Sequence, residues 1–300
     1  MGKIMPKPMT ECNPAEDESK SPRIIWKAGK FCWDLDDMAL VMAILNVTPD
    51  SFSDGGLHLD PVDTLAAARR FIEEGANILD VGGESTRPGA AEVGSEDEIL
   101  RVIPVIKKLV SNEIVAVSID TSKAEVAAAG LAAGATIVND VTGLKDPAMI
   151  DVCAGSNCGI VVMHMQGNPR TMQKSPTYED VVSEIGSFFE ERFETLVSAG
   201  IGSERIVFDP GIGFGKSLSH NLELLNRVED YRVHDRPILM GLSRKSFIGQ
   251  LLGDPEMSRR EFSSQALTAF SRQRGAMIHR VHQVREAVQV LRMTEAVLGS

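Results

Sequence analysis

The stretch IVFDPGIGFGKS, residues 206–217, combines a carboxylate, three glycines and a lysine, which are residue types that can bind a phosphate or a flat ring. A Walker phosphate loop requires glycine where Pro210 stands, and a dinucleotide fingerprint requires glycine where Lys216 stands. Both phosphate templates therefore fail. The glycines that follow Asp209 allow the backbone and Phe214 to approach a planar ligand closely. We predict a ring-binding site here.

Polar side chains also follow the other apolar runs of the chain. Any one of them could simply cap the next helix or turn. Eight runs that all end in this way indicate instead that the side chains converge, as they do where the parallel strands of a barrel end together. These residues are Asn46; Glu84, Thr86 and Arg87; Asp120; Asn139 and Asp140; His164 and Gln166; Asp209; Ser243, Arg244 and Lys245; and Arg280 and His282.

The apolar runs themselves indicate buried parallel strands, because they are rich in β-branched and aliphatic residues without polar alternation. Longer amphipathic segments separate them, such as 178–200 and 95–110, and Ser95 with Glu98 predicts a capping box. Eight strand and helix units favour a TIM (β/α)8 barrel, with an open doubly wound sheet as the alternative. The expected strands are 40–47, 78–83, 114–120, 136–141, 159–165, 205–210, 237–243 and 277–282.

The N-terminal region differs from the rest of the chain. Residues 1–22 are polar and rich in proline, without an apolar period, and predict a disordered tail. Two short apolar runs on either side of Lys27 to Lys30 predict a β-hairpin ahead of the barrel. We therefore expect a single barrel domain over residues 23–300.

Composition limits the possible partners. Acidic residues outnumber basic ones, 42 to 31, which argues against nucleic acid or an anionic membrane as the main partner. No apolar run approaches the length of a membrane span, and a signal peptide is not evident, so we expect a cytoplasmic protein. Four cysteines at irregular spacing do not make a disulfide framework or a zinc site, and we expect reduced thiols.

Several longer motifs resemble those of the dihydropteroate synthase family, in that family's order. The resemblance covers about residues 23–295. It rests on ILNVTPDSFSDGG (44–56), GANILDVGGESTRPGA (75–90), SIDTSKAEVA (118–127), NDVTG (139–143), MHMQGNPRTMQ (163–173), FDPGIGFGK (208–216), GLSRKSFIG (241–249) and RVH (280–282).

The resemblance implies a TIM barrel that joins 6-hydroxymethyl-7,8-dihydropterin diphosphate to 4-aminobenzoate and releases pyrophosphate, with Mg²⁺ as cofactor, in a homodimer. A dissociative reaction is expected, with Asp120, Lys245, Arg280 and His282 as catalytic residues. The residues carried over are Asp120, Asn139, Met163, Asp209, Phe214 and Lys245 for the pterin; Asn46, Arg87, Arg280 and His282 for the diphosphate, with Asn46 also for Mg²⁺; and Phe52, Asp54, Thr86, Arg87, Pro88 and Ser246 for the aminobenzoate.

The chain departs from the family pattern at two places. Gln283 stands where the family has aspartate after RVH, which affects how His282 is oriented, and His279 stands where an apolar residue is usual. Two other functions share the pterin set: a pterin-dependent methyltransferase module and a non-catalytic pterin-binding protein. Lys245 could also be read as a Schiff-base lysine, although it follows a strand instead of lying within one.

Overall fold

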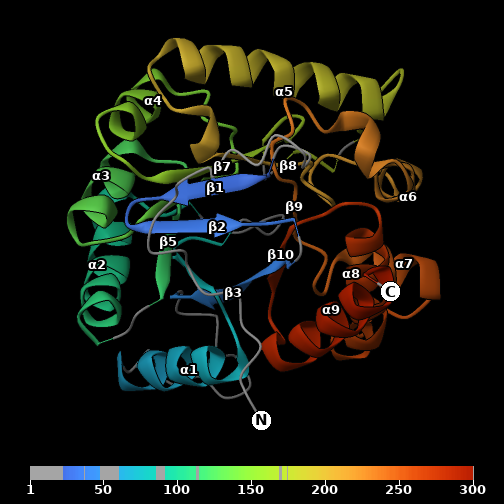
Figure 1. The fold of residues 1–300 in the computed structure, drawn as a ribbon, viewed down its shortest axis with the longest axis horizontal. Coiled ribbons are helices and arrows are strands. Elements are labelled where there is room, and N and C mark those ends of the chain that lie inside the picture. Colours follow the sequence, from blue (N-terminus) through green and yellow to red (C-terminus); the bar gives the residue numbers. More distant parts are fainter. Residues whose placement is uncertain are drawn as a thin grey trace.

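The computed structural model describes residues 23–36, 38–47, 61–85, 92–112, 115–168, 171–173 and 175–299. Within them, parallel strands form one sheet in the order β8-β7-β6-β5-β4-β3-β10-β9, and a parallel bridge from Phe208 to Ile238 joins β8 to the segment before β9. The strands lie at the centre and the helices around them (Figure 1). The predicted TIM barrel is confirmed. Its strands are β3 (Leu40–Asn46), β4 (Ile78–Gly82), β5 (Ala116–Asp120), β6 (Ile137–Asp140), β7 (Gly159–Met163), β8 (Ile206–Asp209), β9 (Leu239–Met240) and β10 (Ile278–Val281).

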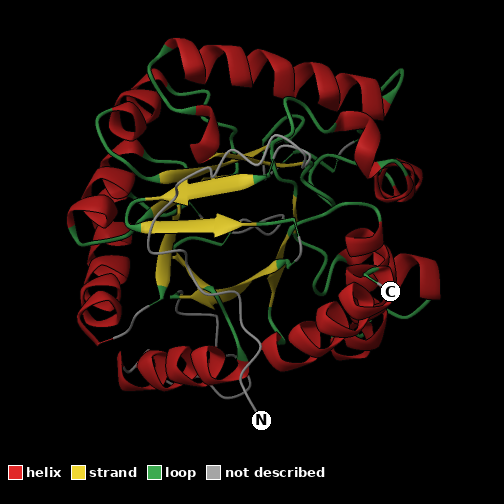
Figure 2. Ribbon diagram, in the orientation of Figure 1, coloured by secondary structure: helices red, strands yellow, loops and turns green. Residues whose placement is uncertain are grey.

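Helices connect consecutive strands and pack on the outside of the ring (Figure 2). Five of them match the amphipathic segments of the sequence, whereas α4, α6 and α7 are too short to show a clear helical period, and α8 is polar over much of its length. The α-helices of the described chain are α1 (Pro61–Glu74), α2 (Ser95–Asn112), α3 (Ala124–Ala132), α4 (Pro147–Ala154), α5 (Val181–Ser198), α6 (Leu218–Asn226), α7 (Ser246–Leu252), α8 (Glu261–Gln273) and α9 (Val284–Leu298), with 3-10 turns at Ser203–Arg205, Val228–Tyr231 and Ser258–Arg260.

The capping box predicted at Ser95 does not form as expected. The carboxylate of Glu98 is fully buried and accepts a hydrogen bond from Lys123 Nζ at 2.6 Å. Lys123 is the N-cap residue of α3, so the partner of Glu98 comes from the start of the next helix. A buried carboxylate is stabilised more by a cation than by a backbone amide at a helix end.

The predicted hairpin is confirmed as β1 (Ile25–Ala28) paired antiparallel with β2 (Phe31–Asp34). Figure 1 shows it lying across one mouth of the ring. Its tryptophans pack against each other with centroids 5.2 Å apart and join the apolar side chains at the amino ends of the barrel strands. Gly159, the first residue of β7, permits the close approach of the hairpin to the barrel, because a Cβ at this position would lie 2.8 Å from the Cβ of Ala28. The hairpin therefore closes the amino end of the barrel and leaves the carboxyl end open.

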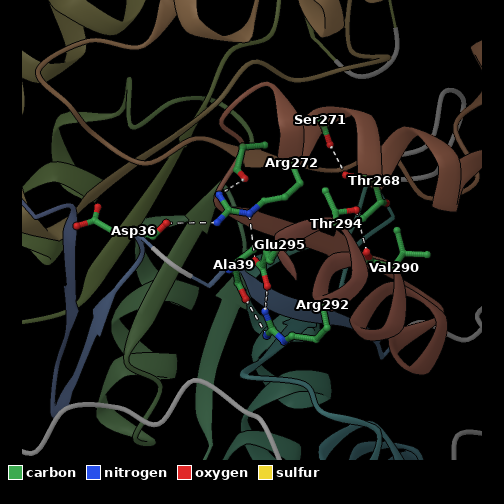
Figure 3. Close-up of polar contacts among 10 residues, drawn as sticks. Asp36, Ala39, Thr268, Ser271, Arg272, Val290, Arg292, Thr294 and Glu295 are labelled. Atoms are coloured by element: carbon green, nitrogen blue, oxygen red, sulfur yellow. Dashed lines mark hydrogen bonds and ion pairs between the residues drawn. The ribbon is translucent and has the colours of Figure 1, made fainter. Parts of the chain in front are cut away.

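A buried ionic network ties the start of β3 to the last two helices (Figure 3). Glu295 accepts from Arg272 Nε at 3.1 Å, forms an ion pair with Arg292, and accepts from the backbone N–H of Ala39 at 2.6 Å. Arg292 in turn donates to the carbonyl oxygen of Ala39 at 3.1 Å. The segment that enters the barrel is thus held by side chains that lie more than 230 residues later in the sequence.

Two further expectations concern the cysteines and the membrane. Cys32 is disulfide-bonded, so the expectation of reduced thiols is wrong there, whereas Cys153 and Cys158 are free and buried. The state of a thiol depends on which segment packs against it, and spacing alone does not reveal this. Among the described residues, no helix is long and apolar enough to cross a membrane. The predicted tail, residues 1–22, lies outside the described chain.

Candidate active site

A cavity of about 440 Å³ opens at the carboxyl ends of the barrel strands, opposite the hairpin. Every described residue that the sequence analysis assigned to a ligand lines it, although these residues come from seven different strands or the loops behind them. The cavity therefore gathers the predicted set in one place, while the assignment of each residue to a ligand stays a prediction. The residues are Asn46, Asp120, Asn139, Met163, Asp209, Phe214, Lys245, Ser246, Arg280 and His282.

The other predicted side chains lie outside the described residues. They belong to two loops, one after β3 and one after β4, and their assigned roles with aminobenzoate and diphosphate stay predictions. These residues are Phe52, Asp54, Thr86, Arg87 and Pro88.

The glycine-rich loop after β8 packs tightly against the end of β7. Gly211 has φ of 65°, and a Cβ at this position would lie 2.0 Å from the carbonyl oxygen of His164, so that only glycine fits. The N–H of Gly211 donates to Asp209 Oδ1 at 2.7 Å, which fixes the carboxylate at the strand end. Lys216 is buried and donates to the carbonyl of Phe214 at 2.9 Å. The lysine of this loop is therefore directed into the protein and not toward a phosphate.

An ionic cluster lies at the base of the cavity. Arg280 donates from Nε to Asp80 Oδ2 at 2.6 Å and from Nη2 to Asp120 Oδ2 at 2.6 Å. Asn139 donates from Nδ2 to the same oxygen of Asp80 at 3.2 Å. Four strands, β4, β5, β6 and β10, thus bring one cation, two carboxylates and an amide together inside the ring.

Burial changes the acidity of these groups. It raises the pKa of Asp120 to about 7, with Arg280 acting in the opposite direction and Asp80 adding to the rise. Burial also raises the pKa of Asp209, against the hydrogen bond from Gly211 and the charge of Lys245. Functional sites commonly contain carboxylates that face a cavity and whose pKa values are raised by burial, as these two are.

Lys245 and Phe214 form one wall of the cavity. Lys245 is the N-cap residue of α7, and its Nζ lies 4.2 Å from the centre of the Phe214 ring. Burial lowers the pKa of Lys245 to about 8, while the charge of Asp209 opposes that change. Phe214 packs on a small apolar cluster that includes Met163. This wall presents an aromatic face, a thioether side chain and an ammonium, which suit a flat, polar ring.

His282 is oriented by a residue that the sequence analysis did not assign to it. Its Nδ1 lies 3.0 Å from Oγ of Ser243, which lies in the loop after the neighbouring strand β9. Ser243 therefore orients the imidazole of His282. The residue after His282 is Gln283, where the family pattern has aspartate.

The donors around Asn46 decide whether the expected metal fits. No group of three or more His, Cys, Asp or Glu side chains among the described residues could hold a metal ion. The cavity wall offers the side-chain oxygen of Asn46, whereas the carboxylates of Glu84 and Asp120, which also line it, are paired with Lys123 and Arg280. Mg²⁺ in proteins is commonly held by one or two side-chain oxygens together with substrate phosphates and water. The donor set fits Mg²⁺ that arrives with a diphosphate, and does not make a preformed metal centre.

Asp80 and Arg260 are among the residues of the site that the sequence analysis missed. Asp80 lies in the middle of the apolar run 78–83. A charged residue in a buried strand requires a partner, so its presence there could have indicated a role in the site. Arg260 lines the cavity from the 3-10 turn Ser258–Arg260 and donates to the carbonyl of Arg244 at 3.2 Å, and no local pattern marks it.

The fold and the site together define a TIM-barrel protein with a polar, charged cavity for a small molecule at the carboxyl ends of its strands. Residues 42–282 match the model of a protein family described as "Pterin binding enzyme". The dihydropteroate synthase of Escherichia coli strain K12 is 47% identical over 260 residues, which are 87% of this chain and 92% of that protein.

Two solved structures extend the comparison. The Xanthomonas albilineans dihydropteroate synthase with 4-aminobenzoic acid has a TM-score of 0.86 at 42% identity, and covers 93% of this chain and all of its own. The Burkholderia cenocepacia dihydropteroate synthase complexed with 7,8-dihydropteroate has a TM-score of 0.84 at 40% identity. The match covers 93% of this chain and 98% of that chain. The chain belongs to the pterin binding enzymes, in the dihydropteroate synthase family of transferases.

Proposed function

We propose that this protein catalyses the dihydropteroate synthase reaction, in which 6-hydroxymethyl-7,8-dihydropterin diphosphate and 4-aminobenzoate give 7,8-dihydropteroate and pyrophosphate, as a step of folate biosynthesis. The observation that carries the proposal is the cavity in which Asp209, Asn139 and Lys245 face one space with the Arg280 cluster. Relatives with 40% identity or more bind the amine substrate and the product of this reaction.

The polar edge of a pterin matches these side chains. The ring presents an amino group and a ring N–H as donors, and a carbonyl and ring nitrogens as acceptors. Asp209 and Asp120 are the proposed acceptors, with Asn139 and Lys245 completing the pattern. A ring with the wrong pattern would leave a buried carboxylate unpaired, at a cost of about 1–3 kcal/mol for each lost partner. Phe214 and Met163 cover the faces of the ring.

The proposed reaction is dissociative. The bond between the methylene carbon and the diphosphate oxygen breaks, both electrons leave with the diphosphate, and the electron-rich ring delocalises the resulting cation. The amine lone pair then forms the new C–N bond, and the amine proton passes to solvent. Asp120 stabilises the cation through its negative charge, while Arg280 and His282 stabilise the leaving group. An arylamine is neutral near pH 7, so a strong general base is not required.

Asn46 is the residue proposed to hold Mg²⁺ together with the substrate diphosphate. When bound, the ion supplies positive charge beside the leaving group. We also propose that the protein is a homodimer, as the resemblance implies, and that it is cytoplasmic, as its sequence predicts.

The test is direct product formation. Purified protein is incubated with dihydropterin diphosphate, 4-aminobenzoate and Mg²⁺, and dihydropteroate and pyrophosphate are measured by mass spectrometry and a coupled assay. We expect equal amounts of both products, and none when either substrate is omitted. Absence of product in the complete mixture contradicts the proposal. Activity that is undiminished by a chelator contradicts the role of Asn46 with Mg²⁺.

A further inference from the structure

Asp80 lies beneath the cavity and not in its wall. Its side chain is fully buried in the middle of β4, and it is absent from the residues that line the cavity. It nevertheless bonds two residues that do line it, Arg280 at 2.6 Å and Asn139 at 3.2 Å, through a single oxygen, Oδ2. The other oxygen, Oδ1, is buried without a hydrogen-bond partner. This carboxylate therefore reaches the ligand site only through its neighbours.

Arg280 divides its hydrogen bonds between two carboxylates that differ in exposure. Its Nε faces Asp80, whose side chain is 0% exposed, and its Nη2 faces Asp120, whose side chain is 11% exposed and lines the cavity. A ligand in the cavity can reach Asp120 but not Asp80. One carboxylate is thus placed to exchange its partner, and the other is placed to keep it.

We propose that Asp80 is a positioning residue, which holds Arg280 and Asn139 in place so that Asp120 can turn from the guanidinium to the pterin without loss of the orientation of Arg280. The proposal rests on the proposed function and names the residue on which the geometry of that site depends. Arg280 bound only to Asp120 would lose its orientation whenever substrate took that carboxylate. The hydrogen bond at Nε fixes the plane of the guanidinium, because Nε is the point where the planar group joins its flexible stem.

The cost of this arrangement supports a functional role. A carboxylate buried in the interior of a barrel is unfavourable unless it is paired, and removal of one partner leaves an uncompensated charge. An apolar residue occupies the same face of β4 two positions earlier, where Ile78 is fully buried among the apolar side chains inside the ring. Within the part of the chain that the structure describes, the one ion pair of Asp80 is with Arg280, which lines the cavity.

The first experiment compares wild-type protein with Asp80→Asn, which preserves size but removes the charge. We expect kcat/KM for the dihydropterin diphosphate to fall by about 10- to 100-fold, with the KM for 4-aminobenzoate changed by less than about threefold. Ser118→Ala is the matched control, because Ser118 is the residue paired with Asp80 on β5, is fully buried, and makes no hydrogen bond through its Oγ. It should keep wild-type kinetics.

A double-mutant cycle with Arg280→Lys identifies the route of the effect. If Asp80 acts through Arg280, adding Asp80→Asn to Arg280→Lys should lower kcat/KM by less than about twofold further. Fully multiplicative losses would contradict the proposal, because they would mean that Asp80 acts on the reaction independently.

The pH profile is a readout that a merely structural role would not change. The groups that influence Asp120 are Arg280 from β10, Asp80 from β4, Glu98 from α2 and Asp140 from β6, and of these the negative charge of Asp80 raises its pKa the most. Asp80→Asn should therefore move the acid limb of kcat toward lower pH. An acid limb that stays in place, in a variant with reduced kcat, contradicts the proposal.

A measurement on wild-type protein covers the case in which Asp80→Asn does not fold. The Arg280 Nε–H signal is assigned in a ¹H,¹⁵N spectrum by its loss in Arg280→Lys. We expect it to exchange slowly with solvent, both in the free protein and with the dihydropterin diphosphate bound. Fast exchange on binding contradicts the positioning role. Wild-type protein that forms no dihydropteroate would instead overturn the proposed function, and the Arg280 signal would still decide whether Asp80 holds the guanidinium.

Discussion

Lys245 Nζ lies 4.2 Å from the centre of the Phe214 ring, so that an ammonium covers the face of an aromatic side chain in the cavity wall. Such a contact contributes about 0.5–2 kcal/mol, depending on burial. Phe214→Leu keeps an apolar side chain but removes the ring. We expect the KM for the dihydropterin diphosphate to rise by about tenfold, in line with a loss near 1.4 kcal/mol. Steady-state kinetics test this, and an unchanged KM contradicts a role for the ring in binding.

Lys245 and Asp209 are the two charged groups expected to be essential for the pterin. Lys245→Ala and Asp209→Ala should each lower kcat/KM by more than about 100-fold, because each removes a charge that stabilises the other buried charged group of the site. Circular dichroism and thermal unfolding show whether the fold is retained. Lys107→Ala, on the exposed face of α2, is the control and should be fully active. Wild-type turnover by either site variant would refute the assignment.

The alkaline side of the pH profile should report Lys245. Burial lowers its pKa to about 8, so the ammonium loses its proton as the pH rises through that value. Activity that needs the ammonium is therefore present below pH 8 and falls above it. Lys245→Arg keeps the charge to much higher pH, and we expect the alkaline limb of kcat/KM to move up by more than about one pH unit. The same limb in both proteins would assign it to another group.

His279 should make the protein less stable in acid. Its side chain is buried, and burial together with the charges of Arg272 on α8 and Arg292 on α9 lowers its pKa to about 3, against a backbone hydrogen bond at Ala276. The unfolded chain binds a proton below about pH 6.5, whereas the folded protein does not. The free energy of unfolding therefore falls with decreasing pH by up to about 1.4 kcal/mol per pH unit in this window.

The variant His279→Leu removes that dependence. We expect the two proteins to differ more in unfolding free energy at pH 5 than at pH 8, with the variant more stable in acid. Urea titrations at the two pH values measure this. Equal pH dependence of the wild-type protein and the variant would mean that other groups account for the acid sensitivity.

Gln283 is the N-cap residue of α9, and its side chain makes no capping hydrogen bond. Aspartate at this position can accept from the free N–H groups of the first turn and interacts favourably with the helix dipole. Gln283→Asp should therefore stabilise the protein by about 0.5–2 kcal/mol. Gln283→Ala is the control and should match wild type within about 0.5 kcal/mol. Thermal unfolding of the three proteins decides the point.

The order of elements could be predicted from the chain because burial on both faces leaves a local signal. Strands β3 to β8 appear as continuous apolar runs, and the polar residue at the end of each run marks where the strand leaves the core. Asn139 and Asp209 could be placed in one site for that reason. The short helices α4 and α7 could not be placed in this way, since two turns do not establish a period.

The amino-acid sequence by itself determined the barrel, its hairpin and most of the polar residues at its open end, since alternation of buried runs and amphipathic helices is a local property. Only the tertiary structure decided which of those groups bond one another. Asp80 meets Arg280 across 200 residues of chain, and Ser243 meets His282 from the loop after β9. Such pairings depend on the register and closure of the sheet, which arise from the packing of the whole ring and leave no trace in any single segment.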